Sequence, residues 1–246
     1  MRTANPWPVA VLAAAMLLAA AAPAAAAPAK ASMKESPRQF MAEIKFGPWR
    51  PDVDKEFKTK TPWKDTFGSG LNLITTLEID WEFFNKVGVI ALGGSIGYSM
   101  ASGHGLLEDG TKSSDTTKFH LLPLGLSLIY RFDYLAQRYR FPFVPYAKGG
   151  IDAYLWWALN GQGDVSKGAD GVSGKGATFG GHATAGLMFL LDALAPMMAQ
   201  TFDTEMGVNN TYLFAEFTWN WIDDFGSKSS MDLSSRTFMA GLAIEF

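Results

Sequence analysis

Apolar and polar side chains alternate at every second position along most of the chain after Pro37. In the segment LNLITTLEIDWEF, residues 71–83, the apolar Leu77, Ile79 and Trp81 alternate with acidic residues. Such alternation places the two kinds of side chain on opposite faces of a strand, whereas a helix would spread the charges around its circumference. The pattern recurs and predicts eight strands, at residues 39–46, 71–83, 87–100, 121–132, 143–157, 177–190, 211–221 and 236–246.

The links between these segments alternate in length. The longer, polar links cover residues 47–70, 101–117, 158–176 and 222–235, and the shorter ones cover residues 85–86, 133–141 and 191–207. We expect a short helix in the last of these. Long loops at one end and shorter turns at the other are typical of outer-membrane barrels. The sequence therefore predicts an all-β fold, an eight-stranded antiparallel up-and-down transmembrane β-barrel.

Alternation alone does not decide which face of the barrel is apolar, because a secreted lipocalin-like barrel has the same pattern around a ligand site. Aromatic residues favour an apolar outer face, since they gather toward the strand ends and flank an aliphatic band, as membrane girdles do. They are Trp81, Phe83, Tyr130, Phe132 and Phe143 toward one end, and Tyr98, Trp157, Trp219 and Trp221 toward the other. The strands also have the roughly 9–11 residues that cross the hydrocarbon at a tilt. We expect lipid-facing apolar side chains around a polar lumen.

The N-terminal segment differs in composition from the rest of the chain. A short polar start with Arg2 precedes an apolar run over residues 9–22, and A-x-A sequences follow. This order is typical of a secretory signal peptide, which we predict at residues 1–27, before a barrel domain at residues 28–246. A membrane-anchor helix is the alternative, but the run is short for a span of ~20 residues. The expected location is the cell outer membrane.

Composition excludes several classes of function. The chain has no Cys, which excludes disulfides, zinc–thiolate sites and Cys nucleophiles. Its formal net charge of −3 provides no basic excess for nucleic-acid binding. The 3 His residues are scattered, so we predict no metal site and no cofactor, and we expect His120 to be solvated at a strand end.

Four segments carry a resemblance to a known family: PLGLSLIYRFDYLAQRYRFPFVPYAKGGIDAYLWW (123–157), GATFGGHATAGLMFLLD (176–192), GVNNTYLFAEF (207–217) and GLAIEF (241–246). Through these segments, and more loosely through the first half, the sequence resembles a family of outer-membrane β-barrel proteins known chiefly from myxobacteria and their relatives. The resemblance implies a small barrel in the outer membrane. It supplies no catalytic residues, because the family has no assigned activity.

With the apolar face toward lipid, the charged side chains of the strands converge in the lumen. An eight-stranded barrel is just wide enough for side chains to fill it, and buried charges are costly unless they pair. We predict a polar network that closes the lumen, made of Glu43, Lys45, Glu78, Arg131, Lys148, Asp152, His182 and Glu216, with Asp80, Glu82 and Glu245 on the same face. The alternative is a narrow channel for small solutes lined by the same residues.

Two further functions have some support in the sequence. Pro123 and Pro145 each remove a ladder donor and are expected to mark strand ends; a wall that opened there would release an apolar solute sideways into the bilayer. Ser99, Ser102 and His104 lie close together in YSMASGHG and would suit a lipid-modifying hydrolase, although no acid is identified to orient the histidine. We predict that the chain is not an enzyme.

The last segment, FMAGLAIEF, alternates up to its final residue. Phe238, Leu242, Ile244 and Phe246 resemble the terminal-strand signal that the outer-membrane assembly machinery reads. That machinery and outer-membrane lipid are therefore the predicted partners. We expect a monomer that binds no nucleic acid and has a structural role or a surface interaction through its long loops.

Overall fold

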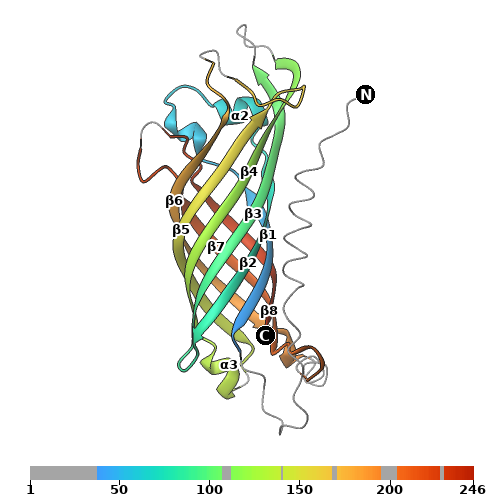
Figure 1. Ribbon diagram of the computed structural model, residues 1–246, viewed down its shortest axis with the longest axis vertical. Coiled ribbons are helices and arrows are strands. Elements are labelled where there is room, and N and C mark those ends of the chain that lie inside the picture. The colour runs from blue at the N-terminus through green and yellow to red at the C-terminus, as the bar shows by residue number, and fades with distance from the viewer. Residues whose placement is uncertain (1–37, 107–111, 140, 168–170, 195–203, 228–229) are drawn as a thin grey trace. The chain divides into compact units, whose positions relative to one another are not determined.

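The computed structural model describes residues 38–106, 112–139, 141–167, 171–194, 204–227 and 230–246 of the chain. Strands dominate these residues (Figure 1): β1 (Phe40–Trp49), β2 (Asn72–Phe84), β3 (Val89–Leu106), β4 (Lys112–Arg131), β5 (Phe143–Leu159), β6 (Lys175–Leu190), β7 (Asn210–Trp221) and β8 (Ser235–Glu245). Short helical segments lie in the connections: η1 (Val53–Glu56), α2 (Pro62–Phe67), α3 (Tyr134–Tyr139) and η2 (Leu191–Ala193). Within the described ranges, no helix is long and apolar enough to cross a membrane.

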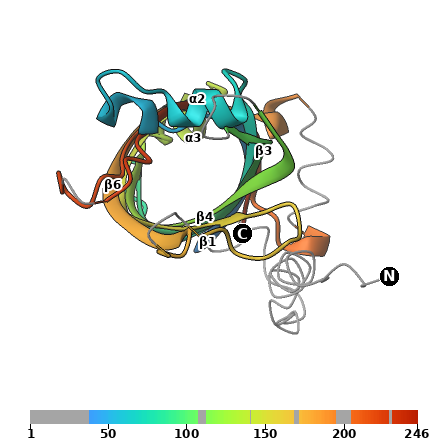
Figure 2. The same ribbon diagram turned by 90° about the horizontal axis from the view of Figure 1, so that it is seen from above.

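The eight strands form a closed antiparallel barrel, which confirms the predicted fold class. Each strand pairs with the next in the sequence, and β8 pairs with β1 to complete the ring. Phe40 and Phe246 extend this last pairing, because each backbone N–H donates to the carbonyl of the other at 2.8 Å. Figure 2, seen from above, shows the ring, with α2 over one side of its rim. Closure removes the exposed edge that an open sheet would present.

The hairpin between β3 and β4 is longer than the sequence predicts. Residues 101–117 were expected to form a loop, but β3 continues to Leu106 and β4 begins at Lys112. Ser102 pairs with Lys118 and His104 with Thr116 in this extension. Gly, Ser and polar residues indicate turns when they are considered alone, whereas cross-strand pairing decides the conformation here. The prediction of a 101–117 loop is therefore wrong.

The outer wall of the barrel is apolar and its inner wall is charged. Ile79 on β2 is 50% exposed, whereas the neighbouring Glu78 is 3% exposed. Leu126 and Leu128 on β4 and Leu242 on β8 are also exposed on the outside. The prediction of an apolar outer face is confirmed.

Aromatic side chains bound this apolar band. On β4, His120 and Tyr130 both face outward and lie about ten positions apart, so at ~3.3 Å per residue and a tilt of ~40° they bracket a band of about 25 Å, the height of a barrel's lipid-facing belt. His120 stacks on Trp157 with ring centroids 5.2 Å apart, and its Nδ1 lies 2.7 Å from the Tyr98 hydroxyl oxygen. These rings cover His120, which is 8% exposed, so the expectation that it is solvated is wrong.

Some predictions fall on parts of the chain that the structure does not describe. The signal peptide, residues 1–27, and its boundary with the barrel domain lie outside the described residues. Of the short helix expected within residues 191–207, η2 supplies one helical turn at Leu191–Ala193 and residues 204–206 are also helical, while residues 195–203 lie outside the described residues.

Candidate functional site: a charged lumen under an aromatic cap

Inward-facing side chains fill the lumen in layers that follow the strand register. We name them from the C-terminal end of the barrel toward α2. The lower layer surrounds Arg131, the middle layer surrounds Lys45 and Lys148, and the upper layer contains Asp152 and His182. An aromatic cap around Trp63 lies beyond the upper layer.

The middle layer is built around two carboxylates that the register places opposite each other, Glu43 on β1 and Glu78 on β2. Like charges at directly opposed positions destabilise a sheet. Lys148 reaches them from β5, with its Nζ 2.6 Å from Glu43 Oε2 and 3.0 Å from Glu78 Oε2. All three side chains are buried, so their attraction is screened much less than that of a surface pair.

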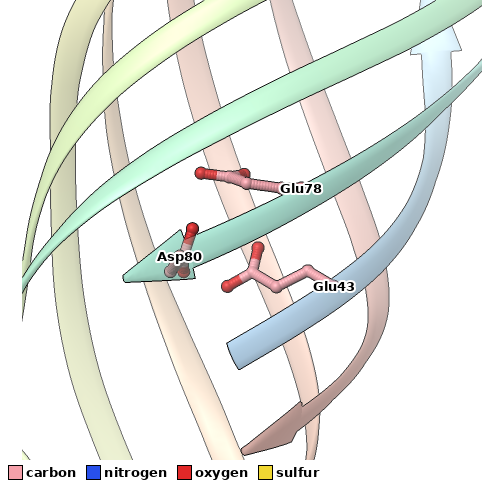
Figure 3. Close-up of side chains that lie close together, drawn as sticks. All are labelled: Glu43, Glu78 and Asp80. Carbon is pink, nitrogen blue, oxygen red and sulfur yellow. The ribbon is translucent and has the colours of Figure 1, made fainter. Parts of the chain in front are cut away.

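A second lysine ties the same layer to β7. Lys45 Nζ lies 2.7 Å from Glu78 Oε2 and 2.9 Å from Glu216 Oε1. The Tyr146 hydroxyl donates to the other oxygen, Glu216 Oε2, at 2.8 Å. Asp80, two positions beyond Glu78 on the same face of β2, completes the acidic group (Figure 3).

The lower layer is organised by arginine. The Arg131 guanidinium donates to Glu82 and, at 2.8 Å, to Glu245 Oε1, so it links β4 to β2 and β8. At the C-terminal end of the barrel, Arg38 forms a 3.0 Å ion pair with Asp133. These contacts fix the strands at the C-terminal end of the barrel.

The upper layer contains a chain of hydrogen bonds across three neighbouring strands. His182 Nδ1 on β6 lies 2.7 Å from Asp152 Oδ2 on β5, and His182 Nε2 lies 3.0 Å from Ser127 Oγ on β4. This is the order of groups found in a serine hydrolase triad. Ser127, however, is paired with Gly93 of β3 and Gly150 of β5, where backbone N–H groups serve strand pairing and not a developing oxyanion.

A small cavity of about 70 Å³ separates the middle layer from the cap. Its wall includes Lys45, Glu78, Ser127, His182 and Trp49. A cavity needs only roughly 10–15 Å³ to hold a water molecule, so this volume is large enough for ordered water. The inward-facing side chains of the three layers are therefore buried against one another in the described barrel, and this cavity lies above the middle layer.

The cap comes from the β1–β2 connection. Trp63 of α2 packs edge-on against Trp49 and Phe119, with ring centroids 5.7 and 5.1 Å away, and against Phe67 at 4.6 Å. Gly103 permits this docking, because a Cβ at that position would lie 1.9 Å from the Thr66 carbonyl oxygen. α2 thus rests directly on the backbone of β3.

The predicted lumen residues all lie on the inner face, divided among the layers. Glu43, Lys45, Glu78, Lys148 and Glu216 meet in the middle layer, Arg131 in the lower one, and Asp152 and His182 in the upper one. Tyr146 and Ser127 were not predicted, although they share the phase of alternation with Lys148 and Arg131. Trp63 was not predicted either, because it lies on no strand and has no such signal.

The residues suggested for a hydrolase do not form a site. Ser99 faces inward and donates to the Leu73 carbonyl at 3.0 Å, whereas Ser102 and His104 are exposed on the extended part of β3. A loop over residues 101–117, as expected, could have brought Ser102 and His104 toward Ser99 at the end of the predicted strand. A strand instead turns alternate residues to opposite faces.

The two prolines differ in position. Pro145 lies near the start of β5, as expected, but Pro123 lies in the interior of β4, opposite Tyr154 of β5. The β3–β4 ladder is interrupted between the pairs Ile96–Leu124 and Ser99–Leu121, at the level of Pro123, which has no N–H to donate. The prediction that Pro123 ends a strand is wrong, because neighbouring pairs on both sides keep β4 continuous.

No protein-family model matches the sequence, and no curated protein sequence matches it. Solved structures share its fold. The outer membrane protein OprG of Pseudomonas aeruginosa aligns with a TM-score of 0.50 at 11% identity, over 86% of this chain and 97% of OprG. The fold therefore defines the class of this chain: a small eight-stranded β-barrel of the outer-membrane type.

Two other structures align over similar lengths. Neisserial surface protein A aligns with a TM-score of 0.45 at 15% identity, over 85% of this chain and 97% of that protein. Ail, the attachment invasion locus protein of Yersinia pestis, was solved in complex with the heparin analogue sucrose octasulfate; it aligns with a TM-score of 0.44 at 13% identity, over 87% of this chain and all of Ail.

Proposed function

We propose that this chain is an outer-membrane β-barrel protein of the myxobacterial type whose lumen is closed by its own side chains. Its role is structural, or a surface interaction through the connections at the α2 end of the barrel. The barrel then acts as a non-conducting anchor that holds these connections at the membrane surface, and it is not an enzyme.

The observation that carries the proposal is the inversion of the usual burial pattern. Ile79 is 50% exposed beside a Glu78 that is 3% exposed. A protein in water seldom buries charged residues and exposes a continuous apolar wall, whereas a barrel in lipid needs that wall and can keep polar groups inside. The predicted signal peptide supports export to the outer membrane.

Cell fractionation combined with a heat-modifiability gel tests the location and the fold together. The protein should appear in the outer-membrane fraction and migrate differently before and after boiling, because a closed barrel resists detergent until it is heated. Recovery as a soluble periplasmic protein without a mobility shift would instead favour a lipocalin-like binder.

Planar-bilayer recording tests the closed lumen. The ion-paired layers and the aromatic cap leave a cavity of about 70 Å³, so the purified full chain should give no stable unitary conductance. A steady conductance that changes when Glu78 or Lys148 is substituted would instead support the narrow-channel alternative.

A second candidate function, a hydrolase, is favoured by the Ser127–His182–Asp152 hydrogen bonds. In such a reaction His182 would take the Ser127 hydroxyl proton as the oxygen attacked an ester carbonyl. Labelling with a fluorophosphonate, read by mass spectrometry, tests it: modification of Ser127 that Ser127→Ala abolishes would support the hydrolase. We expect no modification, because the side chain is buried under the cap.

A further inference from the structure

The middle layer contains more acidic than basic groups. Its charged members are two lysines and four carboxylates: Lys45, Lys148, Glu43, Glu78, Asp80 and Glu216. All six are less than 10% exposed. With every group ionised, two negative charges have no counterpart in the layer. Buried charge without compensation is costly, so this excess requires protons or a bound cation.

The carboxylate oxygens divide into two sets. The ion-pair contacts of Lys45 and Lys148 with Glu43 and Glu78 all involve Oε2. Oε1 of both glutamates and Oδ1 of Asp80 are buried and have no hydrogen-bond partner among the described residues. Each of the three carboxylates thus keeps one oxygen that the lysines do not occupy.

These three side chains converge from neighbouring strands. Figure 3 shows Glu43 extending from β1 beside Glu78 and Asp80 on β2. One oxygen from each carboxylate lies within 4.8 Å of the others. Such an arrangement of oxygen donors suits a hard cation.

Gly93 on β3 provides the space in front of two of these oxygens. A Cβ at position 93 would lie 2.6 Å from Asp80 Oδ1 and 2.8 Å from Glu78 Oε1. Both unpartnered oxygens therefore lie close to the same point on the wall, which Ile129 Cδ1 also approaches to 2.8 Å and which a side chain at position 93 would fill.

We propose that Glu43, Glu78 and Asp80 bind one Ca²⁺ ion in the lumen. Ca²⁺ binds oxygen at about 2.3–2.6 Å in flexible geometry, so two of its ligands lie at most roughly 5.2 Å apart, whereas Mg²⁺ demands near-ideal octahedral geometry and usually keeps several waters. One oxygen of each carboxylate lies within 4.8 Å of the other two, a separation that oxygens bound to one Ca²⁺ can have. One divalent ion also balances the two excess charges, and since Ca²⁺ takes roughly 6–8 oxygen ligands, water molecules would complete its coordination.

This inference rests on the proposed closed barrel and adds a cation to its charged network. The test uses the full chain purified in detergent without lipopolysaccharide, stripped with EGTA and titrated calorimetrically with CaCl₂. We expect one Ca²⁺ per barrel, and an affinity at least tenfold lower for Asp80→Asn and for Glu43→Gln. MgCl₂ at the same concentrations should not compete effectively.

Glu82→Gln is the matched control, because Glu82 is also a buried acid of β2 but belongs to the Arg131 layer. It should bind Ca²⁺ like the unmodified chain. Ca²⁺ should also raise the unfolding midpoint of the unmodified barrel but not that of Asp80→Asn, a difference that a purely structural Asp80 would not produce.

Two results would overturn the cation site. One is the absence of saturable Ca²⁺ binding by a barrel that still shows heat modifiability. The other is infrared absorption of a protonated carboxyl group that persists in excess Ca²⁺ and that Asp80→Asn removes, because protons would then balance the excess charge. Neither result bears on whether the lumen conducts, so failure of this inference and failure of the proposed function are separable.

Discussion

Lys148 carries one positive charge between two acidic side chains that the strand register places opposite each other. If Lys148 is replaced by Met, Glu43 and Glu78 keep their burial but lose the ammonium that bridges them. Removing one partner of a buried ion pair costs about 3–5 kcal/mol. We therefore expect Lys148→Met to lower the free energy of unfolding by this amount, measured by urea denaturation in detergent micelles with tryptophan fluorescence.

Lys118→Met provides the control, because Lys118 is an exposed lysine of β4. Its substitution should lower the free energy of unfolding only slightly. The double variant Lys148→Met with Glu43→Gln should recover part of the loss, since it also removes one of the stranded carboxylates. Equal stability of Lys148→Met and Lys118→Met would contradict the role assigned to the middle layer.

At the scale of the element, α2 depends on a single glycine for its position. A Cβ at residue 103 would collide with the Thr66 carbonyl oxygen, 1.9 Å away. Gly103→Ala should push α2 off β3, at the cost of about 1–3 kcal/mol typical of overpacking. We expect faster proteolysis within residues 50–71 and a red-shifted tryptophan emission as Trp63 becomes exposed, while the barrel keeps its heat modifiability.

Gly94→Ala is the matched control on the same strand, because a Cβ at residue 94 would have no neighbouring heavy atom within 4 Å. It should leave proteolysis and fluorescence unchanged. If Gly103→Ala behaved in the same way, α2 would not be held by close approach to β3.

The strands could be predicted from the sequence because alternation records directly which side chains face lipid and which face the lumen. Glu78 and Lys148 were assigned to the inner face on that basis. The contact between them could not be predicted from the sequence, since it depends on the register of pairing around the whole ring. The α2 cap and the extended β3–β4 hairpin were missed for a related reason: tertiary docking and cross-strand partners override local turn propensity there.

The acidic excess of the middle layer could not be predicted from the sequence for the same reason, because it depends on which strands the barrel brings together. Composition predicts no metal site, because the chain has no Cys and its histidines are few and scattered. Glu43 lies more than thirty positions from Glu78 in the chain, and the barrel brings them together. A cation site assembled across two strands leaves no linear motif.

At the scale of the whole molecule, the stability cost of a new charge on the apolar outer wall depends on its height between the two girdles. Leu126 lies midway between the girdle positions His120 and Tyr130 on β4 and is 48% exposed. Leu126→Arg should lower the free energy of unfolding in lipid vesicles by about 2–4 kcal/mol, the cost of arginine at the bilayer midplane. Equilibrium refolding into vesicles, followed by gel mobility, measures it.

Leu71→Arg is the comparison, because Leu71 is 67% exposed and lies just outside β2 at the rim. Near the interface the same substitution should cost only about 0–1 kcal/mol. Equal costs at the two positions would mean that the wall between the girdles does not face hydrocarbon.

Some ion pairs in the lumen join residues that are far apart in the sequence, and this separation affects the rates of folding and unfolding. Lys148 and Glu43 are 105 positions apart, and Arg131 and Glu245 are 114 apart. These pairs join strands on different sides of the ring, so a sheet in which β1 and β8 have not met gains little from them. Formation of these long-range pairs is deferred to the closing step, which makes barrel formation close to all-or-none and slow to nucleate. Opening the closed ring must break the layers together, so the barrel should persist in lipid through a high unfolding barrier more than through a large equilibrium stability.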